Sequence, residues 1–564
     1  MRKKRILFCS EATFLNTGYA TYTREILNYL NSTGKYELAE LSSYGERNDP
    51  RGLELPWKYY GVMPNQDNEP KATKEELDQY HSNPTYQFGE HIFENVCLEF
   101  LPDVVCDIRD FWMVDFIERS PYRRFFKWAL MPTVDARPQA RQWLATYQSA
   151  DACFTYSDWA GELLKEESGG KINYLGSAPP SAHPAYQQIE DKDEHKKSFG
   201  LDPEYKIIGT VMRNQRRKLY PDLFEAFKKF LDASEDKKYY LYCHTSYPDL
   251  GWDIPELIQQ HGIASNVLFT YICRQTEKPF PSLFKGAMTQ SPFSGQYGAV
   301  LSNVKVGASY EQLSSIINLF DLYVQYANSE GFGMPQVEAA ACGIPVMGTD
   351  YSAMESVLRK LGGITIKPSS LYKELETGCL RAVPDNDLAA KEMADFFKMS
   401  KEMRTNIGKS TREAFEKHYQ WDISGRMWES YFDSVEIAEG HENWLQPPRK
   451  HNPEPLPESF PEEWSTEEVA GWLLSNVLGE PERVNTFLAS RLSRDLMYNS
   501  TTTSTGGMYF NESSAAFDGI RHRGHFDIKT AYDQMANLCA RRNHWEDVRV
   551  QKMENYRKAS VNQA

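Results

Sequence analysis

The sequence predicts an α/β protein made of two doubly wound domains facing a cleft, followed by a mainly helical C-terminal appendix. From residue 5 to 177, short apolar runs alternate with helical stretches, which is typical of a parallel sheet covered by helices. The alternation restarts near residue 206, after a charged connector. Because ligands of such sheets bind beyond the carboxyl ends of the strands, two facing halves predict a ligand cleft between them.

The expected strands of the first domain (residues 1–190) are short and apolar, and they lie at 5–10, 36–43, 103–108, 127–135, 151–157 and 171–177. Those of the second domain (residues 200–384) lie at 206–212, 239–245, 266–271, 320–327, 344–349 and 364–367. Helical spacing takes over from about Asp385 and predicts helices over 385–440.

A proline-rich segment, 441–464, is expected to be an extended linker. It leads to an appendix, 465–564, whose role the sequence leaves open and which could mediate oligomer formation. A helical piece is expected from Ser465, with Glu468 at capping-box spacing.

Composition narrows the functional classes. The chain has 564 residues, 41% of them hydrophobic, and a net charge of −15, which argues against unspecific nucleic-acid binding by the whole surface. No apolar run approaches the roughly 20 residues that cross a bilayer, so membrane insertion is not expected. The nine cysteines occur singly, which suits a reducing cytoplasm and predicts no zinc site of C-x-x-C type.

A glycine-rich turn follows the apolar run 320–327. Gly331 and Gly333 let the backbone turn tightly and approach a ligand. Pro335 suits the first turn of a helix, and Gly343 ends that helix. Free N–H groups at a helix start that faces the carboxyl end of a sheet predict an anion site.

Two carboxylates, Glu330 and Glu338, belong to the same unit. Acids beside a phosphate are unfavourable, so a functional interpretation must give them hydroxyl groups to bind; the alternative is a solvated acid and a helix-dipole contact. Other strand ends carry Gly18, at the start of a helix, and a cluster of four cations: Arg213, Arg216, Arg217 and Lys218. A diphosphate is the anion that this cluster suits, and a solvated basic turn is the alternative.

The stretch EGFGMPQVEAAACGIPV, beginning at Glu330, resembles the signature of the retaining, nucleotide-sugar-dependent glycosyltransferases of family 4, which have the GT-B fold of two Rossmann-like domains. The resemblance covers about residues 1–440 and implies that the last helices cross back to the first domain. It implies that Arg213 and Lys218 grip the donor diphosphate, and that Gly18 belongs to the N-terminal glycine loop. It further implies that Glu330, with Gly331, Phe332, Gly333 and Met334, holds the donor sugar, and that Glu338 binds the ribose hydroxyls.

The chain departs from that family where a histidine commonly lies near the transferred sugar. Thr133 and Asp135 lie at this place instead. Asp135 joins Arg213, Lys218 and Glu330 as a residue expected to act in catalysis, through contact with the sugar or the acceptor; a solvated acid at the end of a strand is the alternative. His183 and His244 are not obvious substitutes. Asp191 and Asp193 have D-x-D spacing but lie in the charged connector, so we expect neither a metal nor another cofactor.

The predicted function is therefore transfer of a hexose or pentose from a nucleoside diphosphate sugar to an acceptor hydroxyl, with retained configuration. The alternatives are a non-catalytic GT-B binding or scaffold protein and a sugar-nucleotide epimerase.

The acceptor is a saccharide, a protein or a hydroxymethylated pyrimidine in DNA. The DNA hypothesis depends on the basic and aromatic stretch 118–142, on a second cluster (Arg521, Arg523, Arg541, Arg542), and on a resemblance to glycosyltransferases of tailed bacterial viruses.

Overall fold

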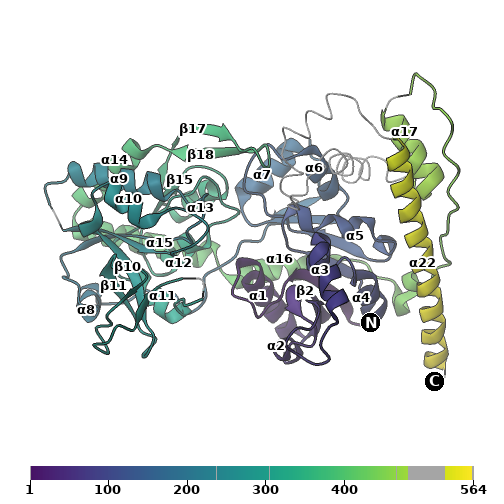
Figure 1. Cartoon of the computed structure of the whole chain (residues 1–564), viewed down its shortest axis with the longest axis horizontal. Helices are drawn as coiled ribbons and strands as arrows, with labels where there is room; N and C mark the ends of the chain where they lie inside the picture. The colour runs from purple at the N-terminus through teal and green to yellow at the C-terminus, as the bar shows by residue number, and fades with distance from the viewer. Residues whose placement is uncertain (1, 237, 304, 465, 481–527, 562–564) are drawn as a thin grey trace.

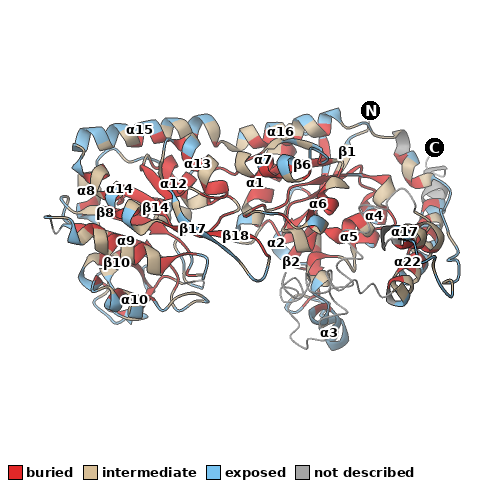
Figure 2. Ribbon diagram, turned by 90° about the horizontal axis from the view of Figure 1, so that it is seen from above, coloured by how far each residue is buried: buried red, intermediate tan, exposed pale blue. Residues whose placement is uncertain are grey.

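A computed structural model describes residues 2–236, 238–303, 305–464, 466–480 and 528–561. It consists of two α/β domains placed side by side, and a long C-terminal helix packs on the outer end of the first domain (Figure 1). In both domains the buried residues concentrate in the sheets, and exposed residues lie on the covering helices (Figure 2).

The described part of the N-terminal domain contains a seven-stranded parallel sheet in the order β3-β2-β1-β4-β5-β6-β7. Its strands are β1 (Lys4–Glu11), β2 (Tyr36–Glu46), β3 (Lys58–Met63), β4 (Val104–Asp107), β5 (Lys127–Leu130), β6 (Ala152–Thr155) and β7 (Tyr174–Ser177). Its helices are α1 (Gly18–Thr33), α2 (Pro50–Leu53), α3 (Lys74–Ser82), α4 (Phe93–Phe100), α5 (Asp115–Arg119), α6 (Arg141–Gln148) and α7 (Asp158–Glu167). The sequence pattern did not predict β3, in which only Gly61 and Val62 are buried.

The connector forms α8 (Lys192–Ser198) and leads into the C-terminal domain. The core of this sheet runs β10-β9-β8-β14-β15-β16, all parallel. Those strands are β8 (Lys206–Val211), β9 (Tyr239–His244), β10 (Val267–Cys273), β14 (Leu322–Gln325), β15 (Val346–Thr349) and β16 (Ile364–Ile366). The helices are α9 (Tyr220–Asp232), α10 (Ile254–Gln260), α11 (Tyr310–Ile317), α12 (Met334–Ala341) and α13 (Ala353–Leu361).

Two additions to this domain were not predicted. Short antiparallel strands extend the sheet beyond β10, namely β11 (Pro279–Leu283), β12 (Met288–Thr289) and β13 (Ala299–Leu301). A separate hairpin, β17 (Pro368–Lys373) with β18 (Leu380–Pro384), follows β16, where we expected the strand series to end.

Three helices follow: α14 (Asn386–Lys398), α15 (Lys401–His418) and α16 (Trp421–Ser434). Helix α14 packs on α9 of the C-terminal domain, whereas α16 packs on α1 of the N-terminal domain. Trp428 and Phe432 of α16 are buried against Phe8 of β1. The chain thus returns to its first domain between α15 and α16, which run along the same side of the two domains (Figure 2).

In the appendix, α17 (Thr466–Trp472) continues into a π-helical segment, Leu473–Leu478, which packs against α22 (Ile528–Val561). The expected helical cap at Ser465, the end of that helical piece, and the residues Arg521 and Arg523 lie outside the described residues. Both views place α22 at the end of the molecule remote from the C-terminal domain (Figures 1 and 2), so it does not cover the junction between the domains. None of the described helices is long and apolar enough to cross a membrane.

Candidate functional site

The glycine-rich turn lies where β14 meets α12, at the junction of the two domains. Gly333 has φ of 86°, a conformation that favours glycine, and Pro335 occupies the first turn of α12. A Cβ on Gly331 would lie 2.5 Å from Cγ2 of Thr133, which belongs to the other domain. Gly331 therefore allows the two domains to approach each other at this point.

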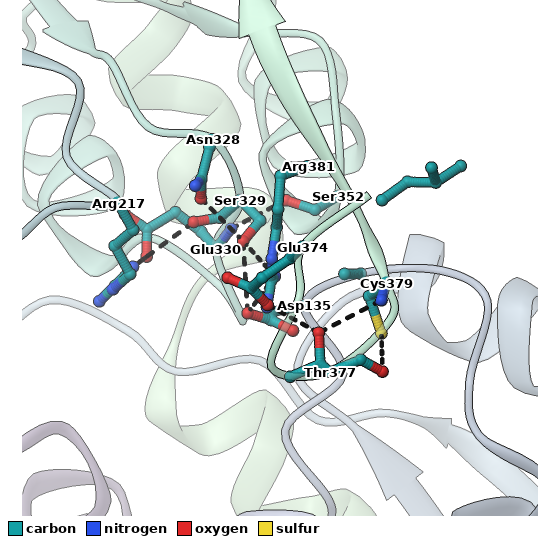
Figure 3. A network of polar contacts seen from close by, with 12 residues as sticks. Asp135, Arg217, Asn328, Ser329, Glu330, Ser352, Glu374, Thr377, Cys379 and Arg381 are labelled. Carbon is teal, nitrogen blue, oxygen red and sulfur yellow. Dashed lines mark hydrogen bonds and ion pairs between the residues drawn. The ribbon is translucent and has the colours of Figure 1, made fainter. Parts of the chain in front are cut away.

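Glu330 is the centre of a charged network on the C-terminal domain (Figure 3). Its carboxylate accepts hydrogen bonds from Arg217 Nη1 at 2.6 Å, from Gln325 Nε2 at 2.8 Å, and from the Lys218 ammonium. Its backbone N–H donates to Ser352 Oγ at 2.9 Å. Two cations and a fixed carboxylate thus meet at the carboxyl ends of β8 and β14, as parallel strands allow.

Arg213, expected beside Lys218, is directed elsewhere. Its guanidinium donates two hydrogen bonds to the Asp249 carboxylate, at 2.8 and 3.1 Å. The Arg213 side chain is 47% exposed. Arg217, which the sequence analysis treated only as part of a basic cluster, takes the position beside Glu330. Gly18 is the exposed first residue of α1, with no atom within 4 Å of where a Cβ would lie.

Glu338 lies in the second turn of α12 and is almost fully buried. Burial raises the pKa of its carboxyl to about 7, and a hydrogen bond with Tyr186 opposes that rise. Tyr186 lies in the connector between the domains, so Glu338 faces the chain that joins them.

The two domains are joined by direct polar contacts. Arg381 of β18 donates to Asp135 Oδ2 at 2.8 Å and to Ser329 Oγ at 2.6 Å, and it also pairs with Glu374 at 2.7 Å (Figure 3). The backbone N–H of Leu380 donates to the carbonyl of Arg137 at 2.6 Å. The unpredicted hairpin therefore holds the loop after β5 and orients Asp135 toward Ser329, whose hydroxyl also donates to Asp135 Oδ2 at 3.3 Å.

A second carboxylate of the N-terminal domain lies nearby and was not predicted. Asp110 follows β4, and Oδ1 accepts a hydrogen bond from the Tyr19 hydroxyl at 2.6 Å. Tyr19 also contacts Thr133 Oγ1 at 2.5 Å. Burial is the main reason that the pKa of Asp110 is raised to about 6, and Asp135 adds to it. In the sequence, the only indication that Asp110 belongs to the site is its position three residues after the end of β4.

The histidines and the D-x-D motif lie in structural positions. His244 contacts Thr270, and burial lowers its pKa to about 4, while His183 stacks on Tyr310. Asp191 caps α8, and Asp193 pairs with Lys401. Among the residues that the structure describes, no group of three or more His, Cys, Asp or Glu side chains could hold a metal ion.

The stretch 118–142 does not form the exposed basic and aromatic surface on which the DNA hypothesis depended. Its aromatic residues are buried in the core of the N-terminal domain: Tyr122, Phe125, Phe126 and Trp128. Most of its cations are paired within the protein, as in Arg123–Asp151 and Arg124–Glu546. Arg541 likewise pairs with Glu90 and Glu94, and Arg542 with Glu480. In this stretch the aromatic residues belong to the domain core, and Arg124 pairs with Glu546 of α22.

Part of the C-terminal domain matches a known family model. Residues 302–414, which include the Glu330 network and Glu338, match the family model "Glycosyl transferases group 1". This segment is therefore similar to glycosyltransferase group 1 domains. A curated relative, the lipopolysaccharide core biosynthesis mannosyltransferase LpsB of Rhizobium meliloti (strain 1021), is 27% identical over 176 residues, which are 31% of this chain and 39% of that protein.

Solved structures extend the similarity to the fold of both domains. Sucrose-phosphate synthase from Thermosynechococcus elongatus aligns with a TM-score of 0.54 and 16% identity, over 77% of this chain and 100% of that one. Anabaena HepE in complex with UDP aligns with a TM-score of 0.52 and 10% identity, over the same shares of the two chains. The N-terminal and C-terminal α/β domains of this chain thus together form a GT-B fold.

Proposed function

We propose that this chain is a retaining glycosyltransferase that moves a sugar from a nucleoside diphosphate sugar to an acceptor hydroxyl. The observation that carries the proposal is the meeting of Arg217, Lys218 and Glu330 at the end of β8 and β14, within the group 1 domain. The complex of HepE with UDP supports a nucleoside diphosphate as the carrier.

Charge neutralisation is the main task of this network. Arg217 and Lys218 would bind the diphosphate of the donor, whose negative charge grows as the bond to the sugar breaks. Glu330, which neutralises both cations in this structure, would then turn to hydroxyls of the donor sugar. Glu338 would accept hydrogen bonds from the ribose hydroxyls. These assignments give both acids of the motif a neutral, hydroxyl-bearing partner.

The transfer step needs no protein nucleophile. The bond between the anomeric carbon and the diphosphate oxygen breaks, and the acceptor oxygen forms a new bond to that carbon on the same face. The acceptor proton passes to the departing phosphate oxygen, which leaves a nucleoside diphosphate and a glycoside. The protein would contribute orientation and charge stabilisation.

Asp110 and Asp135 would face the acceptor from the N-terminal domain. Carboxylates accept hydrogen bonds from hydroxyls and repel a polyanion, so they favour a saccharide over DNA at this position. Asp135 is 36% exposed and bound to Arg381, which fixes its orientation.

A panel of nucleoside diphosphate sugars, scored by thermal stabilisation and donor hydrolysis, tests the proposal. At least one donor should stabilise the protein, and Arg217→Gln or Lys218→Gln should lower its turnover roughly 100-fold. Arg213→Gln should have the same effect if Arg213 leaves Asp249 to bind the diphosphate, and a loss below tenfold would make it a structural residue. No stabilisation by any donor, together with no hydrolysis, would refute the proposal.

A further inference from the structure

A groove lies beside the Glu330 network, on the outer side of the loop after β8. It is formed by residues 215–217 and 219 of that loop, by Leu250 and Trp252, by Asn328, and by residues 372–376 of the β17–β18 hairpin. Its volume of about 620 Å³ falls within the roughly 300–1,000 Å³ of ligand sites. Of the residues proposed to bind the donor, only Arg217 also lines this groove.

Two aromatic side chains line the groove, and hydrogen bonds fix their rings. Trp252 Nε1 donates to the backbone carbonyl of Lys218 at 2.9 Å. The Tyr372 hydroxyl accepts from Asn328 Nδ2 at 3.0 Å. Trp252 is half-buried and Tyr372 is 43% exposed, so both aromatic rings are available to a ligand in the groove. They are anchored to the two segments that carry Lys218 and Glu330.

Exposed leucines extend the apolar surface. Leu250 is 79% exposed and Leu375 is 64% exposed, and both line the groove. A clustered apolar surface of this kind, rimmed by polar residues, is typical of a binding site rather than of an ordinary solvated face.

The polar groups of the groove suit a neutral, hydroxyl-bearing ligand. Arg217 and Glu374 are already paired, with Glu330 and Arg381 respectively. The amide of Gln215 and the mixed charges Arg216, Lys373 and Glu376 also line the groove, together with the Asn328 amide that holds Tyr372. Cations and acids nearly balance here, so a polyanion gains little net attraction.

We infer that this groove binds the non-reacting rings of a saccharide acceptor, an inference that rests on the proposed function. A sugar ring has C–H faces that pack on aromatic rings and hydroxyls that bond to amides and charged groups at the edge. Arg217 and Asn328 form the inner end of the groove, directly beside Ser329 and Glu330. A saccharide lying along the groove can therefore present its terminal ring to the junction between the domains.

An array of neutral oligosaccharides of different lengths, probed with the full-length protein, tests the inference. The wild type should bind a subset of these glycans, and Tyr372→Ala should weaken that binding roughly tenfold or more. Tyr297→Ala is the matched control, because Tyr297 is 64% exposed on the same domain but does not line the groove. Leu250→Ser, at an exposed position, should weaken glycan binding without affecting folding.

Stabilisation by nucleoside diphosphate sugars is measured on the same variants and should not change. Equal glycan binding by the wild type and Tyr372→Ala would overturn the inference, as would a wild type that binds no glycan but is stabilised by a donor. Capture of peptides in place of glycans on a parallel array would also overturn it. If no nucleoside diphosphate sugar stabilised the wild-type protein, that result would count against the proposed function.

Discussion

Glu338→Gln should stabilise the protein at alkaline pH while weakening nucleotide binding. Glu338 is buried in α12, and burial raises its pKa to about 7. A glutamate in an unfolded chain has a pKa of about 4.3. Above pH 7 the folded chain therefore holds a buried carboxylate that the unfolded chain exposes to water, at a cost of about 3 kcal/mol in unfolding free energy.

The sign follows from proton binding. Since the folded pKa of Glu338 lies above the unfolded one, the folded state binds more protons between about pH 4.3 and pH 7. Stability from this group therefore falls as pH rises through that window. The amide has no charge to bury, so the expected gain of Glu338→Gln is about 3 kcal/mol at pH 8 and about 1 kcal/mol at pH 5.

Calorimetry at the two pH values measures this difference. A change of 1 kcal/mol moves the Tm of a 150–250-residue domain by about 2–4 °C, so the variant should melt about 6–12 °C above the wild type at pH 8. Glu413→Gln, at an exposed position of α15, is the control and should change little. A Tm difference that is the same at pH 5 and pH 8 would refute the electrostatic reasoning.

UDP binding, followed by titration calorimetry, tests the ribose assignment separately. Affinity of the wild type should rise from pH 6 to pH 8 as Glu338 ionises, because a carboxylate is a stronger acceptor for ribose hydroxyls than a carboxylic acid. The variant should bind UDP at least roughly tenfold more weakly at pH 8. Equal affinities of wild type and variant would remove Glu338 from the nucleotide site.

Two further substitutions test the contacts between parts of the chain. Arg381→Ala removes the hydrogen bond to Asp135, so the rate of transfer should fall at least roughly tenfold while nucleotide affinity is unchanged. Arg381→Lys should retain part of the activity. Normal transfer by the alanine variant would show that the hairpin contact does not contribute to transfer. Arg124 and the buried Arg549 both pair with Glu546, so Glu546→Gln removes the counter-charge of both, a loss of about 3–5 kcal/mol. Amide exchange of α22 should therefore accelerate with no change in donor stabilisation. Unchanged exchange in α22 would show that other contacts hold this helix.

The sequence by itself determined the features that depend on neighbouring residues. Alternating apolar runs and helical stretches gave the two parallel sheets, because a strand buried on both faces is almost entirely apolar. The turn after β14 was equally readable. Gly333 and Gly343 adopt positive φ and Pro335 sits in the first turn of α12, conformations that these residue types favour without help from the rest of the fold.

The hairpin β17–β18 could not be predicted, for a physical reason. Residues 369–373 are exposed, so this strand buries no face and shows no apolar alternation. The hairpin matters through a tertiary contact, because Arg381 donates a hydrogen bond to Asp135, which is remote in the sequence.

Only the tertiary structure decided which charges act together. Arg213 and Arg217 lie in one basic loop, but Asp249 holds the first, and Glu330 binds the second. The basic and aromatic stretch near Tyr122 has a composition that serves nucleic-acid binding and core packing equally well. Trp128 is buried within β5 and Phe126 packs on Phe93, whereas Tyr122 also contacts Trp545 of α22. No local pattern in the sequence indicates which surface a distant helix will cover.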